Sequence, residues 1–596
     1  MFSNLRPLIP YLRKYRRTYY VGALCVLCHN AVWILFPMVI RDAVRDLNTH
    51  VTTQTLLKYS LYLLAVAATK GIFQYLTRWI LIGVSREIEF DLRNDLFAHL
   101  ERLSYSYYQR TRTGDIMARM TNDLNAVRML LGPGIMYTAN TIIFTAVSLV
   151  FMLSISPRLT LFAFLPLPIF SIVVQHFGRQ IHERFERIQA MFSDISVRAQ
   201  ENFSGARLIR AYVQEEAEIE LFERANEEYI GRSLKLVRLM GMLWPTLETL
   251  LGIAIVIVLF VGGREVIQHR INVGDFAAFN TNMVQLTWPI IALGWVINIL
   301  QRGTASLQRI ESILNEKPEV TDAGVPLVDA PASIKGVIEF RNLSFRYGRT
   351  LQTTDNGKRR TLGDEYVLRN VNLRVPAGTS LAIVGPTGSG KSTLVSLIPR
   401  IYDAAPGSVL IDGRPIREFP LEVLRKNIGF VPQETFLFSD TVRENIAFGA
   451  QNATDADVRR VAEAASIATD IESFPEGYNT VVGERGLTLS GGQKQRTAIA
   501  RALIRNPRIL VLDDALSSVD TQTEDRILNH LREIMQGRTT IFISHRVSTV
   551  RNADRIAVLH DGEIVEYGTH DGLIDRNGYY TELYNKQLLE EELETV

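Results

Sequence analysis

Long apolar stretches alternate with long polar stretches through the first half of the chain. Six of the apolar stretches have the composition of membrane-spanning helices, for which about 20 residues suffice. They cover about Tyr19–Ile40, Leu56–Val84, Met136–Ile155, Leu159–Val174, Leu239–Val261 and Phe276–Leu300. The pattern predicts an all-α transmembrane domain of six spans over residues 18–313.

Two polar stretches with a helical pattern interrupt this series, residues 85–133 and residues 175–238. Residues 1–17 carry a cluster of basic side chains with leucines between them, which predicts an interfacial elbow helix on the cytoplasmic side. Because the number of spans is even, both termini are expected in the cytoplasm, and both polar stretches should extend the helices there. An N-terminus without a transit-like pattern favours the plasma (inner) membrane.

Several polar residues lie inside the predicted spans, where they are costly, and four of them are candidates for a functional role. A lysine near the centre of a span, such as Lys70, costs about 2.5–3.5 kcal/mol on insertion. Such groups usually face a partner or a water-filled cavity. One hypothesis is that they line a solute pathway, and the alternative is a structural pair such as Lys70 with Glu248. The four residues are Lys70, Glu248, Asn282 and Gln285.

Composition agrees with a membrane protein of several domains. The 596 residues exceed one hydrophobic core, and 47% are hydrophobic against 21% charged. A net charge of +2 gives no electrostatic reason to expect a nucleic-acid partner. The two cysteines, Cys25 and Cys28, both fall in the first span and are expected to pack there rather than form a disulfide framework.

The second half has the pattern of a soluble domain. Residues 314–333 are polar, contain three prolines and predict a linker. Residues 334–585 predict an α/β domain, and residues 586–596 an acidic C-terminal tail. Within the domain, residues 349–365 are polar and irregular and predict a surface loop. An aromatic residue just before the core, Tyr347, could stack on a purine ring.

A phosphate-binding loop follows the apolar run Leu381–Val384. The pattern G-x-x-x-x-G-K-[ST] lets backbone N–H groups surround phosphate oxygens, with the following helix adding its positive N-terminal end. In this pattern Lys391 reaches the β- and γ-phosphates, and the Ser392 hydroxyl ligates Mg²⁺. The predicted ATP-binding residues are Gly385, Pro386, Thr387, Gly388, Ser389, Gly390, Lys391, Ser392 and Thr393.

A second signal is the run Ile509–Leu512, which ends in two adjacent carboxylates, Asp513 and Asp514. Four apolar residues in a row predict a buried strand, and ligands bind at the carboxyl edge of an open parallel sheet. Beside a phosphate loop, Asp513 is expected to help hold Mg²⁺ and Asp514 to handle the attacking water.

The motif Leu489-Ser490-Gly491-Gly492-Gln493 resembles the signature of ABC transporters, and with it nearly the whole chain resembles a half-subunit of the exporter type. The resemblance implies a multi-domain fold with a six-helix transmembrane domain and an α/β P-loop ATPase domain. It also implies that the signature contacts ATP bound by a second ABC half-transporter, so that ATP, Mg²⁺, the lipid bilayer and that subunit are the expected partners.

Further positions carry roles by the same resemblance. Tyr347 resembles the adenine-stacking aromatic, Gln433 the glutamine that contacts Mg²⁺, and His545 the switch histidine at the γ-phosphate. Ser518 and Asp520 fall in the loop that crosses between the two sites. Residues 480–486 resemble a loop that touches the cytoplasmic helices. Residues 112–115 and 203–206 resemble the coupling regions of those helices.

The sequence departs from the family pattern at Asp514. Members competent in hydrolysis carry Glu there, and Asp is shorter by one methylene. Slow hydrolysis at this site is therefore expected, in a heterodimer with a competent related subunit (the favoured arrangement) or in a homodimer. The leading function is ATP-driven export of an amphipathic small molecule, a drug or a lipid. Import of a siderophore-like solute and an ATP-gated regulatory subunit are the alternatives.

Overall fold

The computed structural model describes residues 2–49, 52–322, 334–348, 350–353, 359–362, 365–450, 452–483, 488–515, 537–544 and 547–594. The chain divides into two compact units. A membrane unit comprises Met1–Phe97 and Ala118–Leu314, and a nucleotide unit comprises Ala98–Met117 and Asn315–Val596. A segment of the first polar stretch thus folds with the second half of the chain, so one polar stretch is divided between two units.

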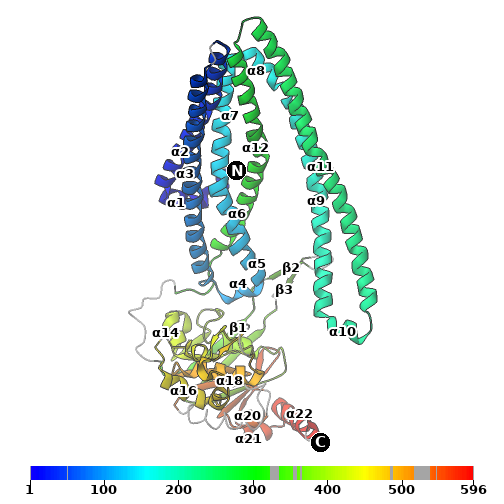
Figure 1. The fold of residues 1–596 in the computed structure, drawn as a ribbon. Coiled ribbons are helices and arrows are strands. Elements are labelled where there is room, and N and C mark those ends of the chain that lie inside the picture. Colours follow the sequence, from blue (N-terminus) through cyan, green and yellow to red (C-terminus); the bar gives the residue numbers. More distant parts are fainter. Residues whose placement is uncertain are drawn as a thin grey trace. The chain divides into compact units, whose positions relative to one another are not determined.

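The membrane unit has six helices, among the described residues, that are long and apolar enough to cross a membrane (Figure 1). This confirms the six-span prediction, and each helix is longer than its apolar stretch. A 3₁₀ turn η1 (Phe2–Leu8) and α1 (Ile9–Lys14) precede them. The long helices include α2 (Arg16–Thr49), α3 (Thr53–Leu100), α9 (Leu167–Ser204), α11 (Glu215–Ile267) and α12 (Val273–Leu314).

The third crossing is one continuous path with two π-helical turns. It consists of α5 (Thr113–Ala118), η2 (Arg119–Asp123), α6 (Leu124–Met129), η3 (Leu130–Gly134) and α7 (Ile135–Ile155). The π-turn η2 ends on a buried carboxylate, Asp123, which accepts hydrogen bonds from Arg309 and Ser306 of α12. π-Turns are rare and occur mostly at functional positions.

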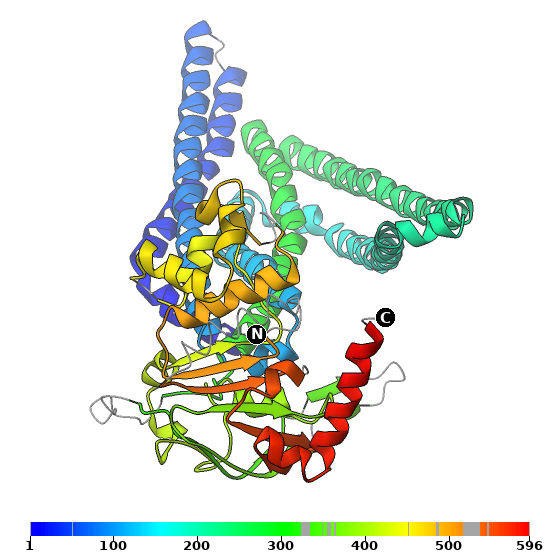
Figure 2. The same cartoon turned by 90° about the horizontal axis from the view of Figure 1, so that it is seen from below.

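A proline break separates the fourth crossing into α8 (Pro157–Phe164) and α9. Ser156 caps α8 by accepting a hydrogen bond from Leu159 N, and Pro157 fits the first helical turn. A short helix, α10 (Ala206–Ala211), then joins α9 to α11. Figures 1 and 2 show α9 and α11 running side by side as a hairpin that diverges from α2, α7 and α12 within the membrane unit.

The nucleotide unit is built on a six-stranded sheet in the order β14-β13-β5-β12-β11-β8, all parallel except β14. All five residues of β11 are buried, as the apolar run predicts. Leu510 and Leu512 face one core and Ile509 and Val511 the other, so the sheet is covered on both faces. The strands are β5 (Ser380–Val384), β8 (Ile428–Val431), β11 (Ile509–Asp513), β12 (Thr539–Ile543), β13 (Arg555–His560) and β14 (Glu563–Gly568).

A second, antiparallel sheet in the order β4-β1-β6-β7 covers one core. Its strands are β1 (Ile338–Phe345), β4 (Leu368–Val375), β6 (Val409–Ile411) and β7 (Arg414–Pro415), and a small pair joins β9 (Asp440–Thr441) to β10 (Val481–Val482). The helices of this unit are α4 (Tyr105–Arg110), α13 (Lys391–Ser396), α14 (Leu421–Lys426), α15 (Val442–Ala447), α16 (Asp455–Ala464), α17 (Ala468–Glu472), α18 (Gly491–Leu503), α20 (Val547–Val550), α21 (His570–Ile574) and α22 (Tyr579–Glu594), with 3₁₀ turns η5 (Ile416–Glu418) and η6 (Gly477–Asn479).

The prediction of a surface loop over residues 349–365 is wrong in part. A two-stranded antiparallel hairpin, β2 (Thr350–Thr353) with β3 (Arg359–Leu362), occupies this stretch. The sequence between the strands contains Asn356-Gly357, the dipeptide that favours a tight hairpin turn. The polar composition of the stretch concealed this signal.

Candidate nucleotide-binding site

The carboxyl ends of β5, β11 and β12 meet at one edge of the parallel sheet, because these three strands are neighbours in register. The phosphate loop follows β5, Asp513 ends β11, and Asp514 comes directly after that strand. This is the edge at which ligands bind in an open parallel sheet. The fold therefore brings together the two strongest sequence signals of the second half.

The phosphate loop needs glycine at two positions. Gly385 has φ of +149° and Gly390 has φ of +98°, conformations that other residues rarely adopt. A Cβ atom at 385 would lie 2.0 Å from the Leu559 carbonyl oxygen, and one at 390 would lie 2.9 Å from Leu368. The loop also holds a buried Ser389 hydroxyl oxygen with no hydrogen-bond partner among the described residues. Glycines leave the backbone of the loop accessible, and the Ser389 hydroxyl has no partner within the described part of the chain. Both features suit the binding of a phosphate group.

Lys391 begins α13 and is buried. Its ammonium donates to the carbonyl oxygens of Gly385 at 2.8 Å and Pro386 at 2.9 Å, so the side chain spans the loop. Burial lowers the pKa of Lys391, while the nearby carboxylates Asp513 and Asp514 oppose that shift. A cation held at this point in a water-poor loop is suited to phosphate oxygens.

Ser392 and Asp513 are in direct contact. The Ser392 hydroxyl donates to Asp513 Oδ1 at 2.9 Å. Burial raises the pKa of Asp513, and the neighbouring charge of Asp514 raises it further. Two hard oxygen donors at the edge of the phosphate loop match the ligands that Mg²⁺ takes alongside phosphate and water. The predicted metal pair thus fits Mg²⁺.

Asp514 has a left-handed backbone, with φ of +50°. Its N–H donates to the Ile543 carbonyl at 3.2 Å, and its carbonyl accepts a long 3.5 Å bond from Gln495 of α18. Asp and Asn adopt this conformation more readily than most residues. The backbone at 514 is therefore held on both sides, by β12 and by the signature helix.

Tyr347 lies in an aromatic cluster after β1. Its ring centroid is 5.2 Å from that of Phe345 and 5.2 Å from that of Tyr402, and its hydroxyl shares a 2.7 Å hydrogen bond with Thr393. Burial raises the pKa of Tyr347. The cluster fixes the aromatic residue predicted for adenine beside the phosphate loop, and it continues to Tyr105 of α4, whose ring centroid lies 5.9 Å from that of Tyr402.

The short helix α4 is anchored to the nucleotide unit by polar contacts as well. Ser106 donates to Glu319 at 2.6 Å, Arg110 pairs with Glu319 at 3.2 Å, and the Ser104 hydroxyl accepts from Val320 N at 2.9 Å. This segment precedes the predicted coupling region 112–115. α4 lies between α3 and α5 in the chain and is held within the nucleotide unit by these contacts.

The signature begins α18. Ser490 is its N-cap: the Ser490 hydroxyl oxygen accepts from Gln493 N at 3.3 Å, and the Gln493 side chain accepts from Ser490 N at 3.0 Å. This reciprocal capping box fixes the first turn. Leu489 is buried, whereas Ser490 is exposed. As predicted, a helix begins at the signature, and its N-cap residue, Ser490, is exposed to solvent.

Comparison with known proteins identifies the family. Residues 19–290 match the ABC transporter transmembrane region, and residues 368–517 match the family described as ABC transporter. The chain is 37% identical over 593 residues, 99% of its length and 98% of the relative's, to YheI of Bacillus subtilis (strain 168), named a probable multidrug resistance ABC transporter ATP-binding/permease protein. The chain belongs to the ABC transporter family.

Other relatives and a solved structure indicate which class of ABC transporter the chain belongs to. It is 37% identical to the multidrug resistance-like ATP-binding protein MdlA of Escherichia coli (strain K12), over 98% of this chain and 96% of that protein. It is 36% identical to an ATP-dependent lipid A-core flippase of Syntrophus aciditrophicus (strain SB), over 98% and 95%. A bacterial Atm1-family ABC exporter with ATP bound superposes with a TM-score of 0.76 at 30% identity, over 96% and 98%. The chain is a multi-pass type IV exporter with fused membrane and ATPase domains that couples ATP hydrolysis to transport.

Some predicted site residues of the transporter are not joined to this cluster. Gln433 follows β8 and is exposed, with no hydrogen bond to the residues that the structure describes. His545, Ser518 and Asp520 lie outside the described residues, as do residues 484–486 of the loop predicted to touch the cytoplasmic helices. Their roles stay predictions.

Two residues that contact the site were not predicted from the sequence. Tyr402 links the adenine-site tyrosine to α4, and Asp470 of α17 binds Gln493 and Arg496 of the signature helix. Neither stands in a motif. Both act across segments far apart in the chain, so only the fold reveals them.

The polar residues of the spans have separate surroundings. Lys70 Nζ lies 3.2 Å from the centroid of the Trp33 ring rather than beside a carboxylate, and Glu248 is exposed. Asn282 is fully buried and exchanges hydrogen bonds with Ser148 of α7 at 3.2 and 3.3 Å. The Gln285 side-chain oxygen is buried without a partner among the described residues. The Lys70–Glu248 pair considered from sequence does not form within the chain.

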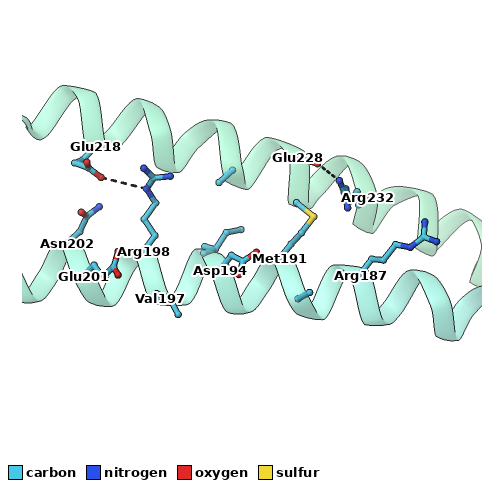
Figure 3. Close-up of a pocket in the computed structure, with 13 residues that line it drawn as sticks. Arg187, Met191, Asp194, Val197, Arg198, Glu201, Asn202, Glu218, Glu228 and Arg232 are labelled. Carbon is cyan, nitrogen blue, oxygen red and sulfur yellow. Dashed lines mark hydrogen bonds and ion pairs between the residues drawn. The ribbon is translucent and has the colours of Figure 1, made fainter. Parts of the chain in front are cut away.

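An open groove of about 820 Å³ lies between α9 and α11 in the extended hairpin (Figure 3). Arg198 of α9 reaches Glu218 of α11 at 3.6 Å, and Arg232 pairs with Glu228 on α11 itself. Charged side chains of both signs line this groove together with apolar side chains such as Met191. The lining residues are Arg187, Ala190, Met191, Asp194, Ile195, Val197, Arg198, Glu201, Asn202, Glu218, Ala225, Glu228 and Arg232.

Proposed function

We propose that the chain is one subunit of a dimeric plasma-membrane exporter of amphipathic small molecules, with cytoplasmic termini, and that its own ATP site hydrolyses slowly. The observation that carries this proposal is Asp514 beside the Ser392–Asp513 pair. Mg²⁺ bound there would neutralise charge on the phosphates. Binding of ATP by Lys391 and the loop is intact, and only the residue for the attacking water is altered.

The length of the side chain decides the effect. An aspartate carboxylate ends about 1–1.5 Å short of a glutamate carboxylate, and misplacement of about 1 Å can cost about 10²-fold in rate. The backbone cannot follow, because Asp514 N–H and C=O are bonded to Ile543 and Gln495. The shorter acid therefore supports binding of ATP better than turnover.

The partner is a second half-transporter, since ABC exporters work as dimers. The signature at Ser490 is complete, so this chain can supply a competent half-site to a related subunit that carries Glu at the position of Asp514. In that heterodimer the Asp514 site mainly binds ATP and holds the dimer together. In a homodimer both sites would be slow.

ATPase measurements test this arrangement. The chain purified alone should hydrolyse ATP slowly, and Asp514→Glu should raise its turnover, by up to about 10²-fold. In complex with a competent partner, Asp514→Ala should change total turnover little. Rapid hydrolysis by the unmodified chain alone would contradict the slow site.

The tip of the α9–α11 hairpin supports a partner on the cytoplasmic side. Four large apolar side chains, Phe203, Leu208, Tyr212 and Val213, are between 63% and 81% exposed around α10. Such a patch marks a contact surface. The nucleotide unit carries a matching exposed aromatic patch, Phe436, Phe438 and Phe448. We propose that α10 docks on this patch of the partner subunit.

A single cysteine at Leu208, in a chain with Cys25 and Cys28 replaced by alanine, tests this docking. A thiol-to-amine crosslinker should give a product of dimer mass in membranes. A product in which the cysteine is joined to its own chain would contradict docking on the partner.

For the solute pathway we propose Lys70, Glu248 and Gln285, and we assign Asn282 to helix packing because its amide is satisfied by Ser148. The Lys70 ammonium and the Gln285 amide oxygen have no hydrogen-bonding partner within the part of the chain that the structure describes, so a polar headgroup could engage them. Lys70→Glu should change the range of dyes transported into inside-out vesicles. Unchanged transport and range would remove this role.

A second candidate function rests on Asp514 as well. A subunit that occupies ATP without sustained turnover could act as a regulatory gate instead of a pump. ATP-dependent accumulation of a dye in inside-out vesicles, with and without the partner, distinguishes the two. Accumulation that requires continued hydrolysis supports export, and passage that needs only bound nucleotide supports the gate.

A further inference from the structure

We infer that Asp470 is a positioning residue for the Leu489–Gln493 signature. Its carboxylate orients the Gln493 amide and so aims the start of α18 at the phosphate bound by the partner subunit. The inference rests on the proposed two-subunit ATP site and adds a residue outside every motif of the sequence.

Both carboxylate oxygens of Asp470 are occupied by donors from α18. Gln493 Nε2 donates to Oδ1 at 2.9 Å, and Arg496 donates to Oδ2 at 2.8 Å and to Oδ1 at 3.3 Å. The Asp470 side chain is 27% exposed and that of Arg496 is 13% exposed, so water competes weakly for these bonds. Arg496 also donates to the Ser466 carbonyl, which holds the turn before α17 to the same helix.

The carboxylate settles which way the Gln493 amide points. An ionised Asp470 can only accept hydrogen bonds, so it selects the NH₂ end of the amide. The opposite end, Gln493 Oε1, then faces Ser490 N and accepts from it at 3.0 Å. If the amide were reversed, its NH₂ group would face the Ser490 N–H, which is also a donor. Its oxygen would face the Asp470 carboxylate, which is also an acceptor. The Asp470 carboxylate and the Ser490 N–H thus select the same amide orientation, and the carboxylate holds the far end of the side chain in place.

The capping box in turn decides which groups remain for an anion. Ser490 N and Gln493 N are used within the box. The N–H groups of Gly491 and Gly492, as the first two of the helix, have no acceptor within it. The Ser490 hydroxyl accepts a bond through its oxygen, so its hydrogen is free to donate. Two backbone donors and one hydroxyl therefore face outward as a set, in the arrangement that binds phosphate at a helix start.

The test uses the full chain assembled in nanodiscs with the subunit that co-purifies with it, or with a second copy if none does. Asp470→Asn keeps the size of the side chain but removes its charge, which weakens its hydrogen bonds with both Gln493 and Arg496. We expect kcat for ATP to fall by about tenfold or more, since donors misplaced at a reacting phosphate are costly. Binding of a fluorescent ATP analogue by the chain's own Lys391 loop should stay unchanged.

A swap variant separates positioning from folding. In D470N/Q493E the direction of the bond is reversed, because the amide introduced on α17 donates and the carboxylate introduced on α18 accepts. That carboxylate can still form a capping box with Ser490. We expect Q493E alone to be impaired and the double variant to recover most of the lost kcat. The control E472Q removes an exposed charge from the same helix as Asp470, and its kcat should equal that of the wild type.

Three outcomes would overturn the inference: an unchanged kcat in D470N, no recovery in the swap, or a loss of kcat in E472Q as large as in D470N. A failure of the proposed heterodimer is a separate result, seen as rapid hydrolysis by the wild-type chain alone. The Asp470 comparison can then be made in the homodimer.

Discussion

The Ser392 hydroxyl donates a 2.9 Å hydrogen bond to Asp513 Oδ1 and joins the first turn of α13 to the end of β11. Two elements more than a hundred residues apart thus bring together the oxygen pair that is predicted to hold Mg²⁺. Ser392→Ala should raise the Mg²⁺ concentration needed for half-maximal ATPase activity by about 10–100-fold, as loss of a metal-site partner typically does. Mg²⁺ titration of ATPase activity measures this shift. Ser396→Ala, one helical turn later, is the control and should not move it.

Asp513 also sets a pH dependence on stability. Its folded pKa is raised, mainly by burial, so the unfolded chain loses this proton at a lower pH than the folded chain does. The free energy of unfolding therefore falls as pH rises through that window, and it stays lower at pH 7. Without nucleotide and Mg²⁺, Asp513→Asn should raise the melting temperature at pH 7, by about 2–4 °C for each kcal/mol relieved. The difference should vanish at a pH below both pKa values. An equal or lower melting temperature at pH 7 would contradict the burial penalty.

The aromatic series Tyr347, Tyr402 and Tyr105 links Tyr347, the residue predicted to stack on adenine, to α4. Tyr105→Ala should leave basal ATP hydrolysis within about twofold but reduce transport by about tenfold, because the lost ring contact lies outside the phosphate site. Tyr105→Phe keeps the ring and should behave as the wild type. Paired measurement of ATPase activity and dye uptake on the same vesicles decides it, and equal losses of both would contradict the link.

Asp123 and Arg309 join the π-turn η2 to α12. Arg309 Nε donates to Asp123 Oδ2 at 2.8 Å, and the carboxylate is buried while the arginine is half exposed. Arg309→Ala leaves a buried carboxylate with one hydroxyl partner and should cost about 1–2 kcal/mol of stability. Thermal unfolding in detergent measures this. D123N/R309A should lose less, and Arg302→Ala, an exposed arginine on the same helix, should lose nothing.

The sequence predicts the parts of the site whose chemistry lies in consecutive residues. The phosphate loop requires its glycines side by side, and the run ending at Asp513 has to be apolar because both faces of β11 are covered. For this reason the loop, the strand and the capped start of α18 were predicted, as were the six spans. The Mg²⁺ contact of Gln433 stays a prediction, because the exposed residue after β8 contacts none of the other site residues that the structure describes.

Contacts between distant segments could not be predicted in the same way. Asp470 stands in the polar helix α17, where an acid is unremarkable, and only packing against α18 gives it Gln493 and Arg496 as partners. The alternative of a structural pair between Lys70 and Glu248 rests on charge alone, and in the structure the Trp33 ring is the neighbour of Lys70 instead. The hairpin of β2 and β3 shows the opposite error, since a turn signal was present but its polar surroundings favoured a loop.

The dimensions of the α9–α11 hairpin give it the mechanics of a lever. The 53 residues of α11 make a rod about 80 Å long, and the hydrocarbon core of a bilayer spans only about 30 Å. With roughly 40 Å of paired helix beyond the bilayer, a tilt of about 5° in the membrane moves α10 by about 3 Å. That displacement is comparable to the length of a hydrogen bond. A nucleotide domain docked on α10, as proposed above, would therefore sense angular changes in the spans that are negligible within the bilayer itself.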